Sequence, residues 1–466
     1  MSKNIRMFEA ITELPDALVQ EAVKTGLKRP RRKWYIAGAA ALLAVALALS
    51  SLMPGGSALS AYALYTPDYP EMARHASYEQ EKAYEAWQTD IRNQRRPGYQ
   101  NGLDYFLETS LAPVLLSGKA GENAVCSPLN LFMALSLLAE TTAGESRDQV
   151  LALLGMDSLE QLRDKADDLW NANYRDDGVT ASVLASSLWL SEDLTYREDT
   201  LQTLADRYYA SSFRGDMADP EYSAALRAWL NEQTGGLLEQ QSADIELDHR
   251  TVLAIASTIR FRDKWAGQFQ ESKTSDQVFH SPAGDQTVPF MHRTSQSHYY
   301  WTEQFGAVKL QLESLGGVWL MLPDEGITPE QILQSGAVTD FLLAKEAERS
   351  SKYLKVDLAL PRFDVTSGLD LEAALQDLGL TAVFDPVQAD FSAVTLEPAH
   401  LSQVRQDARV TVDEEGITAV AYTVMVAPGA GMPPEERMEF TLDRPFVFAV
   451  TNREGLPLFV GIVNMP

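Results

Sequence analysis

Cysteine is almost absent from this chain, which has one, Cys126, in 466 residues. A single cysteine excludes an internal disulfide framework and a cysteine-rich zinc site. The six histidines form no HExxH motif, and the chain has no G-x-S-x-G, P-loop or CxxC pattern. A nucleophile pair of Ser127 or Cys126 with a distant histidine is the remaining enzyme hypothesis, but such pairs arise easily by chance. We therefore predict no enzyme, no metal and no cofactor, and a packing role for Cys126.

Positive charge is also scarce, and it gathers at one end of the chain. The chain has 39 basic and 65 acidic residues, a formal net charge of −26. Residues 1–33 hold eight basic residues and four acids, and residues 34–57 hold no charge, which leaves 31 basic and 61 acidic residues in the remainder. A region with this excess of negative charge repels nucleic acid and anionic membrane surfaces. We predict no nucleic-acid partner.

Residues 34–53 form an uncharged run of 20 residues, long enough to cross a bilayer as a helix. The basic sequence KRPRRK comes directly before it, and Trp34 and Tyr35 are typical of a membrane interface. The positive-inside rule predicts a cytoplasmic tail at 1–33, a retained transmembrane helix at 34–54 and all later residues outside the cytoplasm. A signal peptide cleaved within residues 57–61 and a buried core helix are the alternatives.

The rest of the chain divides into a polar stretch and one large body. Residues 55–97 predict a stalk or linker, which ends near the Arg-Arg-Pro-Gly sequence at 95–98. Residues 98–466 follow without a repeat or a low-complexity tract. Apolar residues recur at helical spacing in the first half of this body, whereas short β-rich runs fill the second half. This order predicts an α+β fold with more than one sheet.

The segment at 411–445 combines two opposite tendencies. Residues 417–427 contain no charge, glycine or proline and are rich in Val, Thr and Tyr, which favours a β-strand. The chain then continues as APGAGMPPEERMEF, whose glycines and prolines forbid regular structure. A strand-forming stretch beside a loop that a protease can cut indicates a segment that becomes a strand only after some event.

Six stretches resemble, in order and spacing across residues 98–466, the serpin family of serine protease inhibitors. Three of them are NAVCSPLNLFMAL at 123–135, AWLNEQTGGLL at 228–238 and STIRFRDKW at 257–265. The others are the stretch with ADFS at 360–394, VDEEGITAVAYT at 412–423, which resembles the hinge of a reactive loop, and LDRPFVFAV at 442–450. The resemblance implies three β-sheets, eight to nine helices and an exposed reactive-centre loop, here at about 414–440. With the N-terminal helix, it indicates a bacterial-type, membrane-anchored member.

The resemblance also implies a mechanism. A protease cuts the exposed loop as a substrate and forms an acyl-enzyme, and the freed loop then inserts as an extra strand into the central sheet. The protease is dragged along and its active site is deformed before water can release it. The stressed native fold stores the energy that loop cleavage discharges.

The hinge and the scissile bond are assigned from the same resemblance. The hinge comprises the acid-acid-Gly match and the residues after it, namely Glu414, Glu415, Gly416, Ile417, Thr418, Ala419, Val420 and Ala421. Counting as the family does places the scissile bond between Ala430 and Gly431. The count can slip by one or two residues, so the neighbouring positions Gly429 and Met432 stay open.

Side chains of an inserted strand alternate between the core and the surface. The family's parity turns Ile417, Ala419, Ala421 and Thr423 inward and leaves Thr418, Val420 and Tyr422 outside. Ile417 replaces the family's usual Thr or Ser, but an apolar β-branched side chain should slow insertion less than a charge would.

The region where the sheet must open carries further departures. Ser127 and Pro128 keep the family's Ser-Pro, and Trp265 ends the central strand. Ser257 stands in place of the usual Asn, and Gln406 in place of the usual His. We predict that a different set of hydrogen bonds holds the sheet shut.

These observations predict a suicide-substrate inhibitor of an extracellular serine protease. Ala430 between glycines suits a small first pocket, as in elastase-like or subtilisin-like enzymes, and cysteine proteases stay open as targets. The alternative is a non-inhibitory serpin that serves as a protease substrate or as a surface binding or adhesion module. We expect a monomer in the cell membrane with a single span and the serpin domain outside the cytoplasm, secreted if the N-terminal segment is cleaved.

Overall fold

The computed structural model describes residues 56–70, 98–177, 180–239, 242–243, 245–247, 251–313, 316–401, 404–417 and 436–466. The chain divides into two units, Met1–Ser60 and Ala61–Pro466, and the second holds nearly all described residues. No helix in the described ranges is long and apolar enough to cross a membrane. The predicted tail at 1–33 and the predicted transmembrane helix at 34–54 lie outside the described residues.

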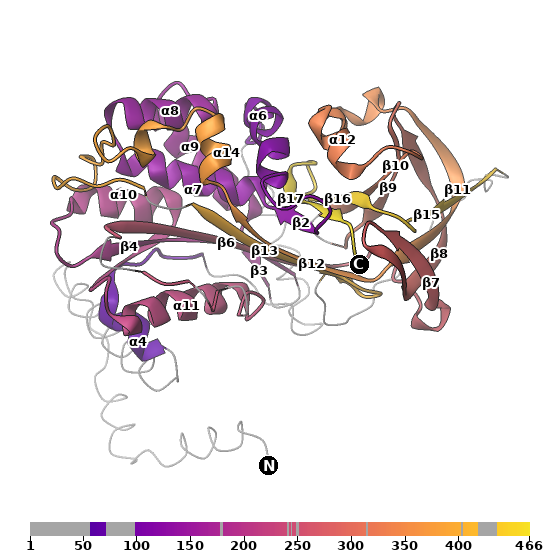
Figure 1. The fold of residues 1–466 in the computed structure, drawn as a ribbon, viewed down its shortest axis with the longest axis horizontal. Helices are drawn as coiled ribbons and strands as arrows, with labels where there is room; N and C mark the ends of the chain where they lie inside the picture. The colour runs from indigo at the N-terminus through magenta and orange to yellow at the C-terminus, as the bar shows by residue number, and fades with distance from the viewer. Residues whose placement is uncertain are drawn as a thin grey trace, which may run out of the picture. The chain divides into compact units, whose positions relative to one another are not determined.

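Ten α-helices lie in the described residues (Figure 1). They are α4 (Gly56–Tyr62), α6 (Asp104–Leu115), α7 (Pro128–Thr141), α8 (Gly144–Leu154), α9 (Leu159–Asn173), α10 (Glu198–Tyr208), α11 (Pro220–Thr234), α12 (Pro329–Gln334), α13 (Ala337–Leu343) and α14 (Glu372–Asp377). Short 3-10 turns occur at Glu271–Lys273, Glu346–Glu348 and Ala382–Phe384.

One sheet has eight strands, in the order β1-β5-β4-β6-β14-β13-β12, with β3 paired to β4. Their bounds are β1 (Ala63–Tyr65), β3 (Arg175–Asp176), β4 (Ala181–Ser191), β5 (Ala210–Gly215), β6 (Leu253–Lys264), β12 (Phe363–Asp370), β13 (Arg405–Val412) and β14 (Gly416–Ile417). β4 pairs antiparallel with β6, and β12 pairs antiparallel with β13. Among the strands that the structure describes, only the two-residue β14 joins these two halves of the sheet.

The other sheet has nine strands, in the order β15-β11-β8-β9-β10-β16-β17-β2, with β7 paired to β8. Their bounds are β2 (Ala124–Cys126), β7 (Ser275–Ser281), β8 (Gly284–Trp301), β9 (Phe305–Gln311), β10 (Gly317–Pro323), β11 (Ser351–Pro361), β15 (Arg437–Thr441), β16 (Phe446–Thr451) and β17 (Pro457–Val463). β16 and β17 form an antiparallel hairpin, as the chain's C-terminal residues predict.

The predicted α+β fold with several sheets is confirmed, but its expected counts need correction. The described strands form two hydrogen-bonded sheets rather than three, because the 18 residues of β8 pair with β7, β11 and β9 and join strands that would otherwise form separate sheets. The described helices number ten rather than eight to nine, partly because α4 forms in residues expected to be a stalk.

The core of the domain lies around α7. Every residue of α7 except Ala134 is buried, and the helix packs on β6 and β17. Figure 1 shows α7, α8, α9 and α10 on one side of the eight-stranded sheet and α11 on the opposite side. Ser127 starts α7, because its side chain accepts a hydrogen bond from the Asn130 backbone, and Pro128 occupies a first-turn position that needs no N–H donor.

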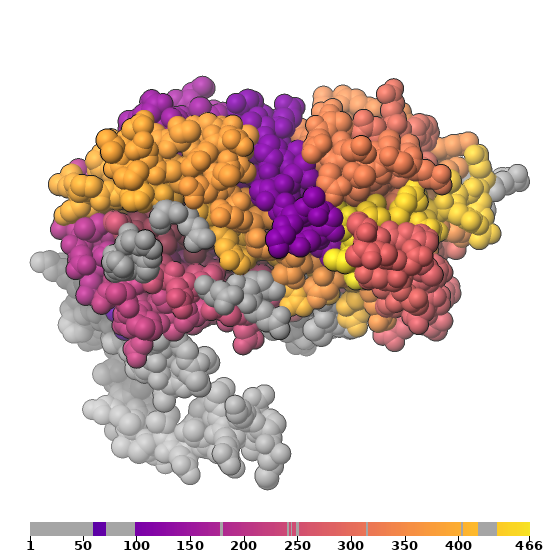
Figure 2. All heavy atoms as spheres, in the orientation of Figure 1, coloured from indigo at the N-terminus to yellow at the C-terminus, as the bar shows by residue number. Residues whose placement is uncertain are grey.

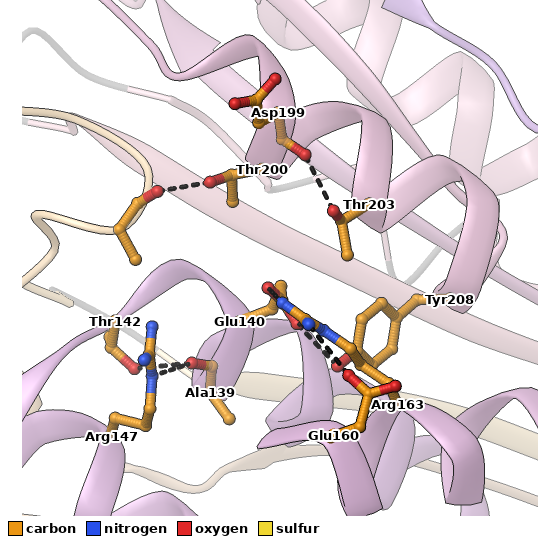
Figure 3. Close-up of polar contacts among 11 residues, drawn as sticks. Ala139, Glu140, Thr142, Arg147, Glu160, Arg163, Asp199, Thr200, Thr203 and Tyr208 are labelled. Atoms are coloured by element: carbon orange, nitrogen blue, oxygen red, sulfur yellow. Dashed lines mark hydrogen bonds and ion pairs between the residues drawn. The ribbon is translucent and has the colours of Figure 1, made fainter.

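A buried ion pair joins three of these helices (Figure 3). Arg163 of α9 binds both carboxylate oxygens of Glu140 in α7, at 2.7 and 2.9 Å. The hydroxyl of Tyr208 in α10 donates to the same carboxylate at 2.9 Å. Glu140 is only 4% exposed, so these donors replace the water that its charge would otherwise require.

Residues 390–395 bind the outside of the helical layer. The backbone N–H groups of Ala143 and Arg197 donate to the carbonyl oxygens of Asp390 and Val394, each at 2.8 Å. Figure 2 shows this part of the chain, in light orange, spread over the helices at one end of the molecule. The contacts hold the starts of α8 and α10 in place.

The structure differs from the sequence-based expectation at the start of the domain. The sequence predicts a stalk over residues 55–97, but β1 pairs with β5 and extends the eight-stranded sheet. A polar stretch with a three-residue strand gives little periodic signal, and the edge of β5 supplies the pairing that the segment lacks by itself.

Candidate functional site

The eight-stranded sheet is open between β6 and β13. Within the described residues, these two strands are connected only through β14. A cavity of about 240 Å³ lies beside β6, lined by Leu226 and Leu230 of α11, residues 254–258 of β6, and Arg405 and Asp407 of β13. Smaller hollows continue on the α7 side. Some Cα atoms of β6 and β13 lie within 8 Å of each other, closer than the roughly 9.5 Å between two strands that flank a third, so a further strand can enter only if this gap widens.

β14 occupies one end of this gap. Gly416 pairs with Lys264 and Ile417 with Asp263 of β6, and Ile417 also pairs with Val412 of β13. A side chain at Gly416 would bring its Cβ within 2.3 Å of the Asp263 carbonyl oxygen, so this close approach requires glycine. Two residues of the predicted hinge, Gly416 and Ile417, are thus part of the sheet.

Ile417 points to the inner face of the sheet and is 2% exposed. Its partner Val412 belongs to the buried, alternating set of β13. Asp263, its partner on the other side, stands two residues from Phe261, whose ring contacts Phe459 of β17. Side chains on one face of a strand recur every second residue, so Ile417 shares the face of Phe261.

An ion pair anchors the start of the hinge. The Arg362 guanidinium binds the Glu414 carboxylate through Nε and one terminal nitrogen, at 2.8 and 2.6 Å, and the Thr274 hydroxyl donates to the same carboxylate. Burial alone would raise the pKa of Glu414, but the hydrogen bonds from Arg362 and Thr274 outweigh it and hold the pKa below its usual value.

Trp265 fixes the turn between β13 and β14. Its indole N–H donates to the Asp413 carbonyl oxygen at 2.8 Å, and its backbone N–H donates to the Glu415 carbonyl oxygen at 3.1 Å. The Asp413 carboxylate accepts from the backbone N–H groups of Glu415 and Gly416. Trp265 is fully buried, so this turn rests on a rigid support.

A hydrogen-bond network bridges the gap on its inner side. The Gln406 amide of β13 exchanges two 3.0 Å bonds with the backbone of Ser127. Asn130, one turn into α7, donates to the Ser257 carbonyl oxygen at 3.0 Å and accepts from the Ser257 hydroxyl. Ser257 also bonds to Ser186 of β4 at 3.0 Å. The start of α7 thus connects β13 to β6 without direct strand pairing.

Cys126 lies on β2 and is 1% exposed. Burial raises the pKa of its thiol to about 12, so the group stays protonated near neutral pH. In the part of the chain that the structure describes, no three His, Cys, Asp or Glu side chains are grouped so that they could hold a metal ion.

The structure unites some of the predicted site residues and separates others. Ser127, Ser257 and Gln406 meet in one network, and Pro128 stands beside it, whereas Trp265 belongs to the hinge. The remaining predicted residues lie outside the described ones, namely Thr418, Ala419, Val420, Ala421, Ala430 and Gly431. Asn130, Thr274 and Arg362 were missed by sequence reasoning. Asn130 alone had a local signal, because it follows Ser-Pro at the first turn of a helix.

Solved structures with the same fold include serpins in their native form. The native-state structure of tengpin, a thermophilic serpin, has a TM-score of 0.69 at 24% identity and covers 86% of this chain and 97% of tengpin. The Arabidopsis serpin AtSerpin1 in its native stressed conformation also has a TM-score of 0.69 at 24% identity, over 79% of this chain and 98% of its own.

Sequence comparison defines the family. The family model for serpins, described as serine protease inhibitors, matches residues 107–466. The chain belongs to the serpin family. Serpin-ZX of Arabidopsis thaliana is 28% identical over 372 residues, 76% of this chain and 94% of the relative. Alpha-1-antiproteinase 2 of Equus caballus is 28% identical over 356 residues, 74% of this chain and 82% of the relative.

Proposed function

We propose that this serpin is a suicide-substrate inhibitor whose cut reactive loop inserts between β6 and β13 and traps a protease as an acyl complex. Membership of the family supports protease inhibition in general. The observation that carries the proposal is the position of β14, because Gly416 and Ile417 already pair with both sides of the gap. In the sequence, Thr418 and the rest of the predicted reactive loop follow directly after Ile417.

The register of β14 sets where a longer strand would lie. Gly416 stands opposite Lys264 and Ile417 opposite Asp263, so each further loop residue moves one position back along β6. Ala427 then falls opposite Leu253, the first residue of β6. Residues 417–427 are the uncharged stretch without glycine or proline. The strand-forming stretch and the open length of β6 therefore match.

Small loop residues would meet the large inward side chains of β6. In the same register Ala419 falls opposite Phe261 and Ala421 opposite Ile259. Thr423 falls opposite Ser257, where its hydroxyl can join the polar network at the start of α7. Pairing a small residue with a large one fills the layer without overpacking, which favours insertion.

The covalent step uses the chemistry of the protease. Its serine oxygen attacks the carbonyl carbon of Ala430, an ester forms, and the bond to the Gly431 nitrogen breaks. The new amine of Gly431 leaves with the proton that the protease's histidine took from the serine. Gly429 and Met432 are the neighbouring alternatives for the cut. For the protease to be trapped, the loop must insert faster than water hydrolyses the ester.

The target that fits this loop is a serine protease with a small first pocket, such as an elastase-like or subtilisin-like enzyme. Ala430 has a glycine on each side. A trypsin-like enzyme needs Arg or Lys at the cut. The basic residue nearest to Ala430 is Arg437, which is the first residue of strand β15 and stands opposite Lys355 in the neighbouring strand β11. A cysteine protease of similar preference is the alternative target.

The apolar run at 34–53 supports a location at the cell membrane. In this proposal the run is a retained single-pass helix, and the serpin domain acts as a monomer outside the cytoplasm. Cleavage within residues 57–61 would instead release the domain.

The test is to mix the protein with an elastase-like protease and look for a complex that survives SDS. We expect such a complex, and we expect Ile417→Arg to prevent it by turning the inhibitor into a substrate. In the intact variant the two-residue β14 can leave the sheet and expose the new charge, whereas full insertion must bury the guanidinium at a cost of several kcal/mol. Insertion therefore slows, and the stoichiometry of inhibition rises about tenfold or more.

Two matched variants control this test. Ile417→Val keeps an apolar β-branched side chain inside, and Thr418→Glu places a charge one residue further, on the outer face and opposite Arg262 in the register of β14. Both should inhibit at a stoichiometry near that of the wild type. Clean cleavage by every tested protease with no complex would refute inhibition and favour a non-inhibitory serpin that acts as a substrate or a surface binding module.

A further inference from the structure

Residues 62–69, which we name the edge segment, lie along the outer edge of the eight-stranded sheet. Within it β1 pairs antiparallel with β5, with Ala63 opposite Phe213 and Tyr65 opposite Ser212. A tyrosine stands at each end of the segment, Tyr62 before the strand and Tyr69 after it. These two rings make the contacts that carry the inference.

Tyr69 completes a stack of four aromatic rings. Its ring lies nearly parallel to those of Trp170 in α9 and Tyr174, with centroids 5.7 and 5.5 Å away. Trp170 also stacks on Tyr209 at 3.6 Å, and the Tyr69 hydroxyl donates to the Tyr209 carbonyl oxygen at 3.4 Å. Tyr209, which follows directly after α10, is the only non-glycine residue with a positive φ in the described ranges, and such backbone needs support from its neighbours.

Tyr62 contacts the helix that crosses the sheet. Its ring centroid is 4.9 Å from that of Tyr222 in α11. Tyr222 is fully buried, and its hydroxyl bonds to the backbone N–H and carbonyl oxygen of Leu190 in β4, at 3.1 and 3.2 Å. Tyr222 also contacts the ring of Trp189. One end of the edge segment therefore reaches both α11 and β4.

Widening of the gap must move the parts that the edge segment holds. α11 supplies Leu226 and Leu230 to the wall of the cavity, and β4 and β5 lie on the β6 side of the gap. The other end of the segment binds α9 and the end of α10, which pack on α7. The segment thus ties the side of the sheet that must move to the helical layer on its inner face.

We propose that the edge of β5, with the rings of Trp170, Tyr174 and Tyr209, is a binding site for an extended tyrosine-bearing peptide. Residues 62–69 of this chain are its ligand, and their binding holds the sheet against opening. The inference rests on the proposed function, because the opening that the segment restrains is the one through which the loop would enter.

The test compares amide hydrogen exchange in the full-length wild type and in full-length Tyr69→Ala. We expect exchange in α11, β4 and β6 to become at least fivefold faster in the variant, because the segment detaches from the stack. A synthetic peptide of residues 60–70, added in excess, should restore protection. The same peptide with alanine in place of its Tyr69 should not.

Two variants separate the ring stack from a general loss of stability. Tyr69→Phe keeps the ring and loses only the hydroxyl, and Leu64→Ala changes a side chain of β1 that is 44% exposed. Both should exchange within twofold of the wild type. Faster exchange confined to residues 61–70 and the stacked rings would overturn the proposal. The measurement needs no protease, so a chain that exchanges as expected but inhibits nothing overturns the proposed function alone.

Discussion

Glu414 holds the start of the hinge, and its charge decides how firmly. The carboxylate is 5% exposed and accepts hydrogen bonds from Arg362 and Thr274. Its backbone carbonyl oxygen also accepts from the N–H of Phe269 at 3.2 Å. The side chain and the backbone of Glu414 together fix the position of the turn that follows β13. A change in the charge of this carboxylate therefore weakens the hydrogen bonds that hold the turn.

We expect the anchor at Glu414 to weaken in acid. Its pKa is depressed in the folded protein, so its contribution is fully present above the unfolded pKa of about 4.3 and is lost as the pH falls through the lower, folded value. Glu414→Gln should therefore cost about 1–2 kcal/mol of the free energy of unfolding near pH 7. Denaturant unfolding at a series of pH values measures this cost.

The cost of Glu414→Gln should shrink as the pH falls below the unfolded pKa of about 4.3 and through the lower pKa of folded Glu414, because both chains then carry a neutral group. A difference between the two proteins that stays constant over this range would contradict the anchor. Glu415→Gln is the matched control, because Glu415 forms its hinge contacts through its backbone.

At the scale of elements, the helical layer depends on the carboxylate shared by α7, α9 and α10 (Figure 3). Of these helices, α9 packs on β4 and α10 packs on β5. Removing one partner of a buried ion pair leaves the other charge without compensation, which costs more than the pair contributes when intact.

Arg163→Met should lower the free energy of unfolding by about 3 kcal/mol, the low end for a buried pair, because the Arg163 side chain is 28% exposed. Denaturant unfolding gives the value. Asp164→Asn is the control, since it breaks the exposed ion pair between Asp164 of α9 and Arg207 of α10 and should cost less than about 1 kcal/mol. Equal losses in the two variants would show that burial of Glu140 does not govern the contact.

At the scale of the whole molecule, the eight-stranded sheet is incomplete in the part of the chain that the structure describes. The strands on each side of the gap are well paired to their outer neighbours, and β14 pairs at one end only. Filling the gap would add backbone hydrogen bonds along two edges, each with a net contribution of about 1 kcal/mol. The molecule would then gain more from one inserted strand than from any single side-chain contact.

Cleavage of the reactive loop should raise the melting temperature by on the order of 10 °C, since roughly ten new backbone bonds would form. Differential scanning calorimetry of the intact and the cut protein checks this. Cleavage of the Ile417→Arg variant should raise the melting temperature by less than cleavage of the wild type does, because the charge of the new side chain opposes insertion. An unchanged melting temperature after a confirmed cut in wild-type protein would mean that the loop does not enter the sheet.

Local sequence already determined much of this protein. Ser127 and Pro128 predict the start of α7, and the break between helical spacing and β-rich runs predicts the α+β order, because capping and periodicity act within one turn or one strand. Residues 414–416 match a family hinge, and their neighbours 417–427 have the composition of a strand. These features are properties of adjacent residues and need no tertiary contact to be recognised.

Only the tertiary structure decided which distant residues meet. Gln406 bonds to Ser127 across 279 residues of chain, and Arg362 reaches Glu414 across 52. β1 becomes a strand only because the edge of β5 accepts it, and its composition carried no such signal. Hydrogen bonds and ring stacks between remote segments depend on the packing of the whole chain. For that reason the sequence alone could predict a hinge, whereas the contacts of Glu414 with Arg362 and the pairing of the edge segment could be found only in the fold.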